Sequence, residues 1–112
     1  MYAIAFDLEQ DTLSKTYGSP TYTNAYNDIK NVLIAYGFTR QQGSVYFGDS
    51  DKVDAVRCVL AVQDLTKKYP WFASSVKDIR MLRIEDNNDL RPAIDMISNS
   101  TQKAYDSSPH SE

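Results

Sequence analysis

The sequence predicts a single α+β domain in which two helices cover one face of a four-stranded antiparallel sheet. The chain has 112 residues, enough for one domain and too few for two. Segments 2–8, 38–48 and 76–85 alternate between apolar and polar or small residues, and a period of two is typical of strands. Segments 21–36 and about 50–68 carry apolar residues at helical spacing.

The first strand is expected at residues 2–8, where bulky and small side chains alternate. Its two faces carry Tyr2, Ile4, Phe6 and Leu8 on one side, and Ala3, Ala5 and Asp7 on the other. Residues 9–20 are polar and end in a Gly-Ser-Pro turn, so we expect a loop there. A helix is expected at residues 21–36, and Gly37 follows its last apolar position, where a left-handed C-cap is common.

A hairpin is expected next, with strands at residues 38–41 and 44–47 joined at Gln42-Gly43. An Asp-Ser pair then supplies the N-cap of a second helix at about 50–68, and Pro70 stops this helix. We expect its apolar stripe to face the sheet. The stripe comprises Ala55, Val59 and Val62, beside Val56 and Leu60.

The last strand is expected at residues 76–85, followed by a short helix at residues 88–97. From residue 98 onward the chain is rich in Ser, Asn and Asp, a composition typical of disorder. The sequence therefore predicts a folded domain at residues 1–97 and a disordered tail at residues 98–112.

The resulting order, β-α-β-β-α-β, is the ferredoxin-like arrangement. Right-handed crossovers give the spatial strand order 4-1-3-2 and place both helices on one face of the sheet. The other face stays open, and we expect it either to pair with a second copy or to be solvated. Its side chains are expected to include Ala3, Ala5, Ser44, Tyr46, Asp78 and Arg80.

Composition narrows the range of functions. The net charge of −3 and the pI near 5.0 argue against a broad, charge-driven nucleic-acid binder. Cys58 is the only cysteine, so neither an intrachain disulfide nor a cysteine metal site is expected. The sequence shows no signal peptide and no apolar run long enough to span a membrane, so we expect a cytoplasmic protein. The one histidine, His110, lies in the expected tail, which argues against a Ser-His-Asp site.

Three polar residues are expected to converge at one edge of the open face: Asp7, Ser44 and Asp78. The end of the first strand lies beside the starts of the third and fourth strands, because both run antiparallel to it. Two neighbouring carboxylates can bind a divalent cation, or one of them can act as a general base. Arg40 and Arg80 border the same region and suit a phosphate, so the set fits phosphodiester cleavage.

Each of these residues also has a structural interpretation. Asp7 at a strand end can be a turn or cap residue, and Ser44 follows a glycine in an expected turn. Asp78 can form a surface ion pair with a basic neighbour, an interaction worth little. Spacing alone leaves both interpretations open.

Three segments identify a family resemblance: MYAIAFDL, TRQQGSVYF and WFASSVKDIRMLRIED. Together they resemble the virulence-associated protein D (VapD) family over about residues 1–97. The resemblance implies a ferredoxin-like dimer, similar to the small CRISPR-associated integration-complex nuclease subunit. It implies active-site positions at Asp7, Ser44 and Asp78. The segment DNNDLRPAIDMI departs from the family pattern, since it lacks the tryptophan expected there.

The resemblance further implies an endoribonuclease that acts as the toxin of a toxin–antitoxin pair. We expect single-stranded RNA to be the substrate, bound through Arg40, Arg80 and Tyr46. Asp7 would serve as a metal ligand, for which Mg²⁺ is the candidate cofactor, or as a general base. The expected partners are a second copy and a small antitoxin protein. The competing hypothesis is a non-catalytic dimeric module that binds nucleic acid or protein.

Overall fold

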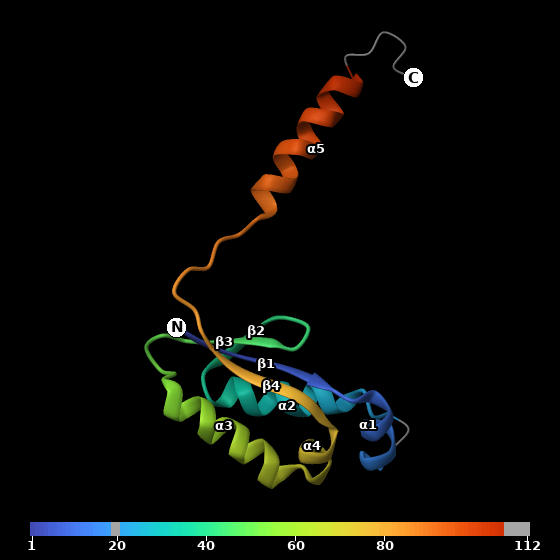
Figure 1. Cartoon of the computed structure of the whole chain (residues 1–112), viewed down its shortest axis with the longest axis vertical. Helices are drawn as coiled ribbons and strands as arrows, with labels where there is room; N and C mark the ends of the chain where they lie inside the picture. The colour runs from blue at the N-terminus through green and yellow to red at the C-terminus, as the bar shows by residue number, and fades with distance from the viewer. Residues whose placement is uncertain (19–20, 107–112) are drawn as a thin grey trace.

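The computed structural model describes residues 1–18 and 21–106. It contains four strands and five helices, seen together in Figure 1. In chain order they are β1 (Tyr2–Leu8), α1 (Gln10–Thr16), α2 (Asn24–Ala35), β2 (Phe38–Gln42), β3 (Val45–Gly48), α3 (Ala55–Lys68), α4 (Pro70–Ser75), β4 (Val76–Arg83) and α5 (Arg91–Asp106).

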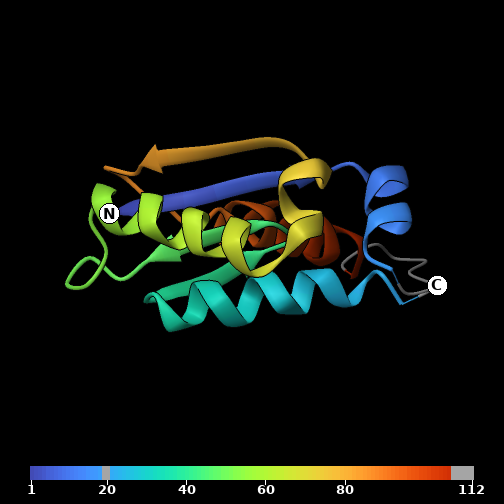
Figure 2. The same cartoon turned by 90° about the horizontal axis from the view of Figure 1, so that it is seen from below.

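The sheet confirms the predicted topology. Its strand order is β2-β3-β1-β4, and every pair of neighbouring strands is antiparallel. Helices α2 and α3 lie side by side on one face, as the view in Figure 2 shows. Gly37 follows α2 with a φ of +99°, the left-handed conformation that the sequence predicts at this position. The fold is therefore the expected ferredoxin-like α+β arrangement.

The core lies between this sheet face and the helices. Strand β1 contributes Ile4, Phe6 and Leu8 to it, as the alternation predicts. The helices contribute a larger set: Leu13, Ala25, Ile29, Val32, Leu33, Cys58, Ala61, Leu65, Trp71 and Phe72. Asp7, by contrast, is exposed at the end of β1, so the strand that anchors the core also presents a carboxylate to solvent.

The segment expected as a loop at residues 9–20 contains helix α1, so that expectation was wrong. Glu9 caps this helix, because its carboxylate accepts a hydrogen bond from the Asp11 backbone N–H at 3.0 Å. Leu13 is fully buried in the core and gives the helix its apolar anchor. Such a short helix has too few apolar positions to produce a periodic signal, and tertiary packing stabilises it.

Helix α3 begins later than the sequence predicts and buries a different face. Its N-cap is Asp54, whose side chain accepts from the Arg57 backbone N–H at 2.8 Å. The buried positions are Cys58, Ala61 and Leu65. The expected stripe was wrong in large part, since Val56, Val59 and Leu60 are exposed.

The C-terminal helix is longer than expected. It begins at Arg91 and reaches Asp106, so it continues through the start of the expected tail. The remaining tail positions, residues 107–112 with His110, lie outside the described residues. In Figure 1, α5 stands on the side of the sheet opposite to α2 and α3, beyond the extended segment that follows β4. Across the described part of the chain, every helix is too short or too polar to cross a membrane.

Candidate active site

Asp7 and Asp78 face each other across two neighbouring strands. They are registered partners in the ladder between β1 and β4, and both are exposed. Directly opposed residues of an antiparallel pair point to the same face of the sheet, with their Cα atoms about 5.5 Å apart or less. The structure therefore confirms that these two carboxylates converge on the open face.

A β-bulge lies next to this pair. The register shifts between Asp7 and Leu8, because Leu8 pairs with Val76 and leaves Lys77 without a partner across the ladder. A bulge increases the local twist and redirects nearby side chains, and bulges are common beside active sites. The sequence carried a signal for it, because the apolar residues Val76 and Ile79 are three positions apart and break the period of two.

Arg80 supplies a positive charge beside the carboxylates. Its Nε lies 3.1 Å and 3.2 Å from the two carboxylate oxygens of Asp78. Arg80 is opposite Ala5 in the ladder, and this small neighbour leaves space above the strand. The guanidinium is therefore positioned to meet a phosphate that approaches the carboxylate pair.

The carboxylate of Asp7 is free of such a partner. None of the hydrogen bonds and ion pairs within residues 1–18 and 21–106 involves its side chain. The same described residues contain no group of three acidic, cysteine or histidine side chains arranged to bind a metal. A cation here would have two carboxylates as protein ligands, and Mg²⁺ sites commonly use one or two, completed by water and substrate phosphate.

Two expectations about the open face were wrong. Tyr46 is 2% exposed and stacks on Phe6 with ring centroids 6.1 Å apart, so it belongs to the helix-covered face. Ser44 is half-buried in the turn before β3, and its carbonyl accepts from the Phe6 backbone N–H at 3.1 Å. Continuing the register sets Ser44 opposite Phe6, on the face away from Asp7.

These corrections change the expected roles of the two residues. A fully packed Tyr46 cannot stack on a base in this structure, so β3 presents Val45 and Phe47 to the open face in its place. The Ser44 backbone fixes the end of β1 beside Asp7. A part for the Ser44 hydroxyl in catalysis stays a prediction.

Arg40 lies on β2, two strands away from Asp7 in the sheet. Its Nε donates to the carbonyl of Gly43 at 2.9 Å, which brings the guanidinium to the turn that leads into β3. The ladder between β1 and β3 sets this turn beside the end of β1. Arg40 is, however, the ladder partner of Tyr46, so its side chain points to the helix-covered face. The expectation that Arg40 borders the site on the open face was therefore wrong.

The open face also carries a hollow of about 660 Å³ between the hairpin and the start of α5. Four amide side chains line it: Gln41, Gln42, Asn87 and Asn88. Val45 and Phe47 form its floor on β3, and Val45 is the ladder partner of Ala5 on β1. The hollow therefore shares a sheet face with the carboxylate pair, which sequence reasoning did not find because it depends on the path of residues 84–90.

A buried hydroxyl pair supports the end of the sheet where Asp7 lies. Ser75 is fully buried, and its Oγ is 3.2 Å from the Oγ1 of Thr16 in α1. The Ser75 carbonyl accepts from the Glu9 backbone N–H at 2.7 Å. Helix α1 is thereby fixed to the junction of α4 and β4, which holds the two strand ends of the site together.

Known proteins are similar to this chain over most of its length. The family model for CRISPR associated protein Cas2 matches residues 1–91. Endoribonuclease VapD 2 of Riemerella anatipestifer is 57% identical over 94 residues, which are 84% of this chain and 99% of that protein. An endoribonuclease VapD homolog of Helicobacter pylori is 48% identical over 97 residues, 87% of this chain and 99% of that protein.

A more distant relative gives the same result. Endoribonuclease VapD of Haemophilus influenzae is 39% identical over 90 residues, which are 80% of this chain and 92% of that protein. The ferredoxin-like topology, the matched family model and the identities over most of each chain agree. Residues 1–91 match the family model for CRISPR associated protein Cas2, and the chain belongs to the VapD family.

Proposed function

We propose that this protein is an endoribonuclease that cleaves single-stranded RNA at the edge formed by Asp7 and Asp78. The observation that carries the proposal is the direct pairing of these two exposed carboxylates, one free and one next to Arg80. The relatives named endoribonucleases support it, because they match 84% and 87% of this chain, and the matched family model covers residues 1–91, which include both carboxylates.

The two carboxylates would have different roles. Asp7 is unpartnered among the described residues, so it is free to accept a proton from the attacking hydroxyl or to bind a cation. Asp78 positions Arg80 through the contacts at 3.1 Å and 3.2 Å. In that position the guanidinium would neutralise charge that develops on the scissile phosphate.

The choice between a proton acceptor and a metal ligand can be decided by experiment. A two-carboxylate site fits Mg²⁺, which would supply a Lewis acid at the phosphate when bound. Cleavage that stops in EDTA and returns with added Mg²⁺ would assign Asp7 as a ligand. Cleavage unaffected by EDTA would assign it as the general base.

The open face suits an RNA strand that passes the carboxylates and continues into the hollow. Unpaired bases offer hydrogen-bonding edges and an aromatic face for stacking. The hollow provides both kinds of contact, through amides such as Gln42 and Asn88 and through the ring of Phe47. Arg80, beside the carboxylates, would contact the RNA backbone on the same face.

The biological setting is a further part of the proposal. We propose that the protein acts in the cytoplasm as a homodimer, and as the toxin of a pair whose antitoxin is a small protein. The family resemblance supports this setting. Growth arrest on expression that is relieved by a small protein from the neighbouring reading frame would support it. Growth unaffected by expression would contradict it.

The direct test is RNA cleavage by Asp7→Asn protein. This change keeps the shape of the side chain and removes its charge, so we expect cleavage to fall by roughly a hundredfold or more. Asp51→Asn is the matched control, since Asp51 is an exposed aspartate in the turn before α3. The same purification of both variants controls for contaminating nuclease. Cleavage by Asp7→Asn at the parental rate would refute the proposal and favour a non-catalytic binding module.

A further inference from the structure

Lys77 is the extra residue of the bulge in β4, and the roles proposed above do not involve its side chain. The ladder pairs Asp78 with Asp7, and the register shifts immediately beyond this pair. Lys77 therefore lies next to the facing carboxylates without a partner of its own across the ladder. Its side chain is exposed, and no hydrogen bond or ion pair among the described residues involves its ammonium group.

The apolar residues on either side of the bulge show to which face it turns Lys77. Val76 and Ile79 both pack against the core, so both lie on the face that the helices cover. A regular strand has one residue between two neighbours of the same face, whereas two exposed residues, Lys77 and Asp78, separate this pair. Asp78 lies on the open face with Asp7. The bulge therefore places Lys77 on the open face as well, directly beside Asp78.

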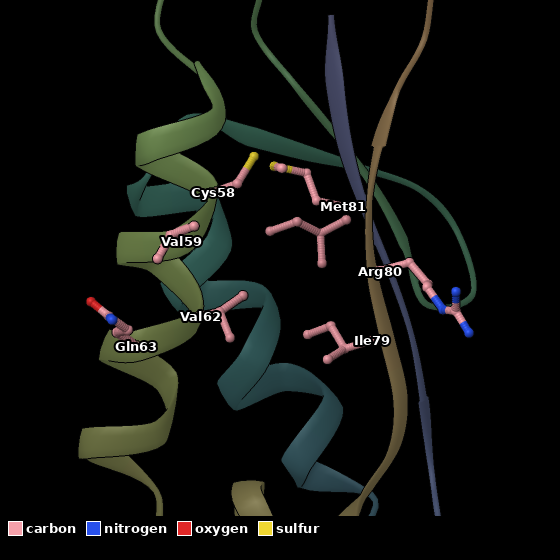
Figure 3. Close-up of a pocket in the computed structure, with 8 residues that line it drawn as sticks. Cys58, Val59, Val62, Gln63, Ile79, Arg80 and Met81 are labelled. Atoms are coloured by element: carbon pink, nitrogen blue, oxygen red, sulfur yellow. The ribbon is translucent and has the colours of Figure 1, made fainter.

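The strand regains its regular alternation after the bulge. In Figure 3, Ile79 and Met81 point from β4 towards α3, where they line an apolar pocket, and Arg80 extends from the other side of the strand. The open face of β4 at the site thus carries three charged side chains: Lys77, Asp78 and Arg80. Two positive groups flank one carboxylate, and the Asp7 carboxylate lies opposite.

Cleavage of an RNA strand by its own 2′-hydroxyl needs two proton transfers. A base removes the proton of the attacking hydroxyl, and an acid protonates the 5′-oxygen as the bond from this oxygen to phosphorus breaks. Asp7 can provide the first transfer. Arg80 cannot provide the second, because a guanidinium group stays protonated in proteins. Histidine often acts as the acid, but the described residues contain none, since His110 lies outside them.

Lys77 can supply the second transfer. A lysine ammonium group has three N–H donors on a flexible stem and, unlike a guanidinium group, can release a proton. The other open-face side chains on the described strands β1, β3 and β4 are the two carboxylates, Arg80 and apolar groups. An ionised carboxylate has no proton to donate. Lys77 is therefore the one group on these three strands that can act as the acid.

We propose that Lys77 is the general acid of RNA cleavage at this site and that the bulge presents it. This inference rests on the proposed function, with Asp7 as the base. As the 2′-oxygen attacks, its proton passes to Asp7 and its bond to phosphorus forms. The bond between phosphorus and the 5′-oxygen breaks, and the Lys77 ammonium group donates a proton to that oxygen. The products are a 2′,3′-cyclic phosphate and a 5′-hydroxyl, and proton exchange with water restores both side chains.

The positions of the two cations suit this division of roles. Lys77 and Arg80 lie on opposite sides of Asp78 along β4, with Cα atoms about 10 Å apart at the usual rise of a strand. Asp78 holds the guanidinium group through the contacts at 3.1 Å and 3.2 Å. Both side chains are long enough to reach a phosphate between them, so Arg80 can contact its free oxygens while Lys77 contacts the leaving oxygen.

Variants of Lys77 separate proton donation from charge. Lys77→Met removes the ammonium group and keeps the bulge, so cleavage of ordinary RNA should fall about a hundredfold. Lys77→Arg keeps the positive charge but does not release a proton, so its cleavage should stay well below that of the parent. Lys67→Met is the matched control, since Lys67 is exposed on α3 at the covered face, and it should cleave at the parental rate. Parental cleavage by folded Lys77→Met or Lys77→Arg protein would overturn the proposal.

A modified substrate tests the acid directly. The probe is a single-stranded RNA in which sulfur replaces the 5′-oxygen of the bond that the parent cleaves. The leaving thiolate needs no proton, so Lys77→Met should cleave this RNA at nearly the parental rate. Asp7→Asn should lose cleavage of both RNAs, because attack by the 2′-oxygen is common to them. An equal loss by Lys77→Met on both RNAs would show that Lys77 acts through its charge alone, which would overturn the proposal.

This inference and the proposed function fail in different ways. Products that carry a 5′-phosphate would overturn the role of Lys77, since the 5′-oxygen would then not be the leaving group, and would leave the site at Asp7 in place. The same holds for parental cleavage by Lys77→Met beside an inactive Asp7→Asn protein. Parental cleavage by Asp7→Asn would instead refute the proposed function.

Discussion

The Asp78 carboxylate pairs with Arg80, whereas the directly opposed Asp7 carboxylate has no such partner among the described residues. Two acidic groups in facing positions thus have different electrostatic surroundings. This asymmetry assigns Asp7 to the chemistry and Asp78 to the placement of a positive charge. The predictions below test the consequences for activity and stability.

Replacing Arg80 by alanine should lower RNA cleavage by roughly tenfold while changing stability little, because the lost charge acts mainly on the phosphate. An exposed ion pair contributes at most about 1 kcal/mol to the free energy of unfolding. The measurement is kcat/KM beside the melting temperature. Lys68→Ala is the control, because it breaks another exposed ion pair, the 3.4 Å contact with Asp64 on α3. Equal cleavage by both variants would remove Arg80 from the site.

Deleting Lys77 tests whether the bulge aims Asp78. The deletion keeps Val76 opposite Leu8 and Asp78 opposite Asp7, now with regular alternation, so we expect the protein to fold. Loss of the bulge reduces the local twist beside the carboxylates and should lower cleavage. Lys77→Ala keeps the bulge and should cleave faster than the deletion variant. If the deletion variant cleaves at the parental rate, the bulge has no part in the site.

The sequence predicted the fold and the facing pair of Asp7 and Asp78, because both follow from the alternation of side chains along the strands and from the order of the strands. Alternation along β1 separates Ile4 and Phe6 from Asp7, and the crossover rule then fixes the strand order. Asp7 and Asp78 meet because antiparallel strands bring the end of one beside the start of the other. These features follow from local periodicity and topology alone.

The faces of Ser44 and Tyr46 could not be predicted in the same way. Their faces follow from the register between β1 and β3, in which Tyr46 pairs with Ile4 on the helix-covered side. A difference of one residue in this register would move every side chain of β3 to the other face, and the sequence alone does not fix it.

On α3, the buried positions are Cys58, Ala61 and Leu65. The larger apolar residues Val56, Val59 and Leu60 stay exposed. The spacing of apolar residues alone did not distinguish these two faces of the helix.

Replacing Leu13 by alanine should destabilise the protein strongly. The Leu13 side chain is 0% exposed in the core, and removing it leaves a cavity, which costs about 2–5 kcal/mol in the free energy of unfolding. Leu90→Ala is the matched control, because Leu90 is 71% exposed and should change that free energy by less than about 0.5 kcal/mol. Urea denaturation measures both. Similar values for the two variants would show that α1 does not pack as described.

The thiol of Cys58 should be unreactive in the native protein. Burial raises the pKa of Cys58 above its ordinary value of 9.0, and the negative charge of Asp54 adds to the effect. The thiolate is the nucleophile that attacks thiol reagents, so labelling at neutral pH should be far slower in native than in urea-unfolded protein. Equal labelling rates in the two states would contradict the buried position.

The same raised pKa predicts a loss of stability at alkaline pH. Above pH 9.0 the unfolded chain releases the Cys58 proton before the folded chain does, so the free energy of unfolding falls as the pH rises through the folded pKa. Below pH 9.0 both states hold the proton and this contribution is fully present. Melting temperatures between pH 8 and pH 10 should fall more steeply for the parent than for Cys58→Ala. Parallel curves would exclude Cys58 as the titrating group.

A double-mutant cycle on Asp7 and Asp78 tests the central claim most directly. The measurement is single-turnover cleavage of one single-stranded RNA by Asp7→Asn, Asp78→Asn, the double variant and the parent, all checked for native folding. Residues that act as one unit are strongly non-additive. We therefore predict that both single variants lose activity and that the double variant is no slower than the slower single variant. Rate losses that multiply in the double variant, or parental cleavage by Asp7→Asn, would contradict the claim that the facing carboxylates form one site.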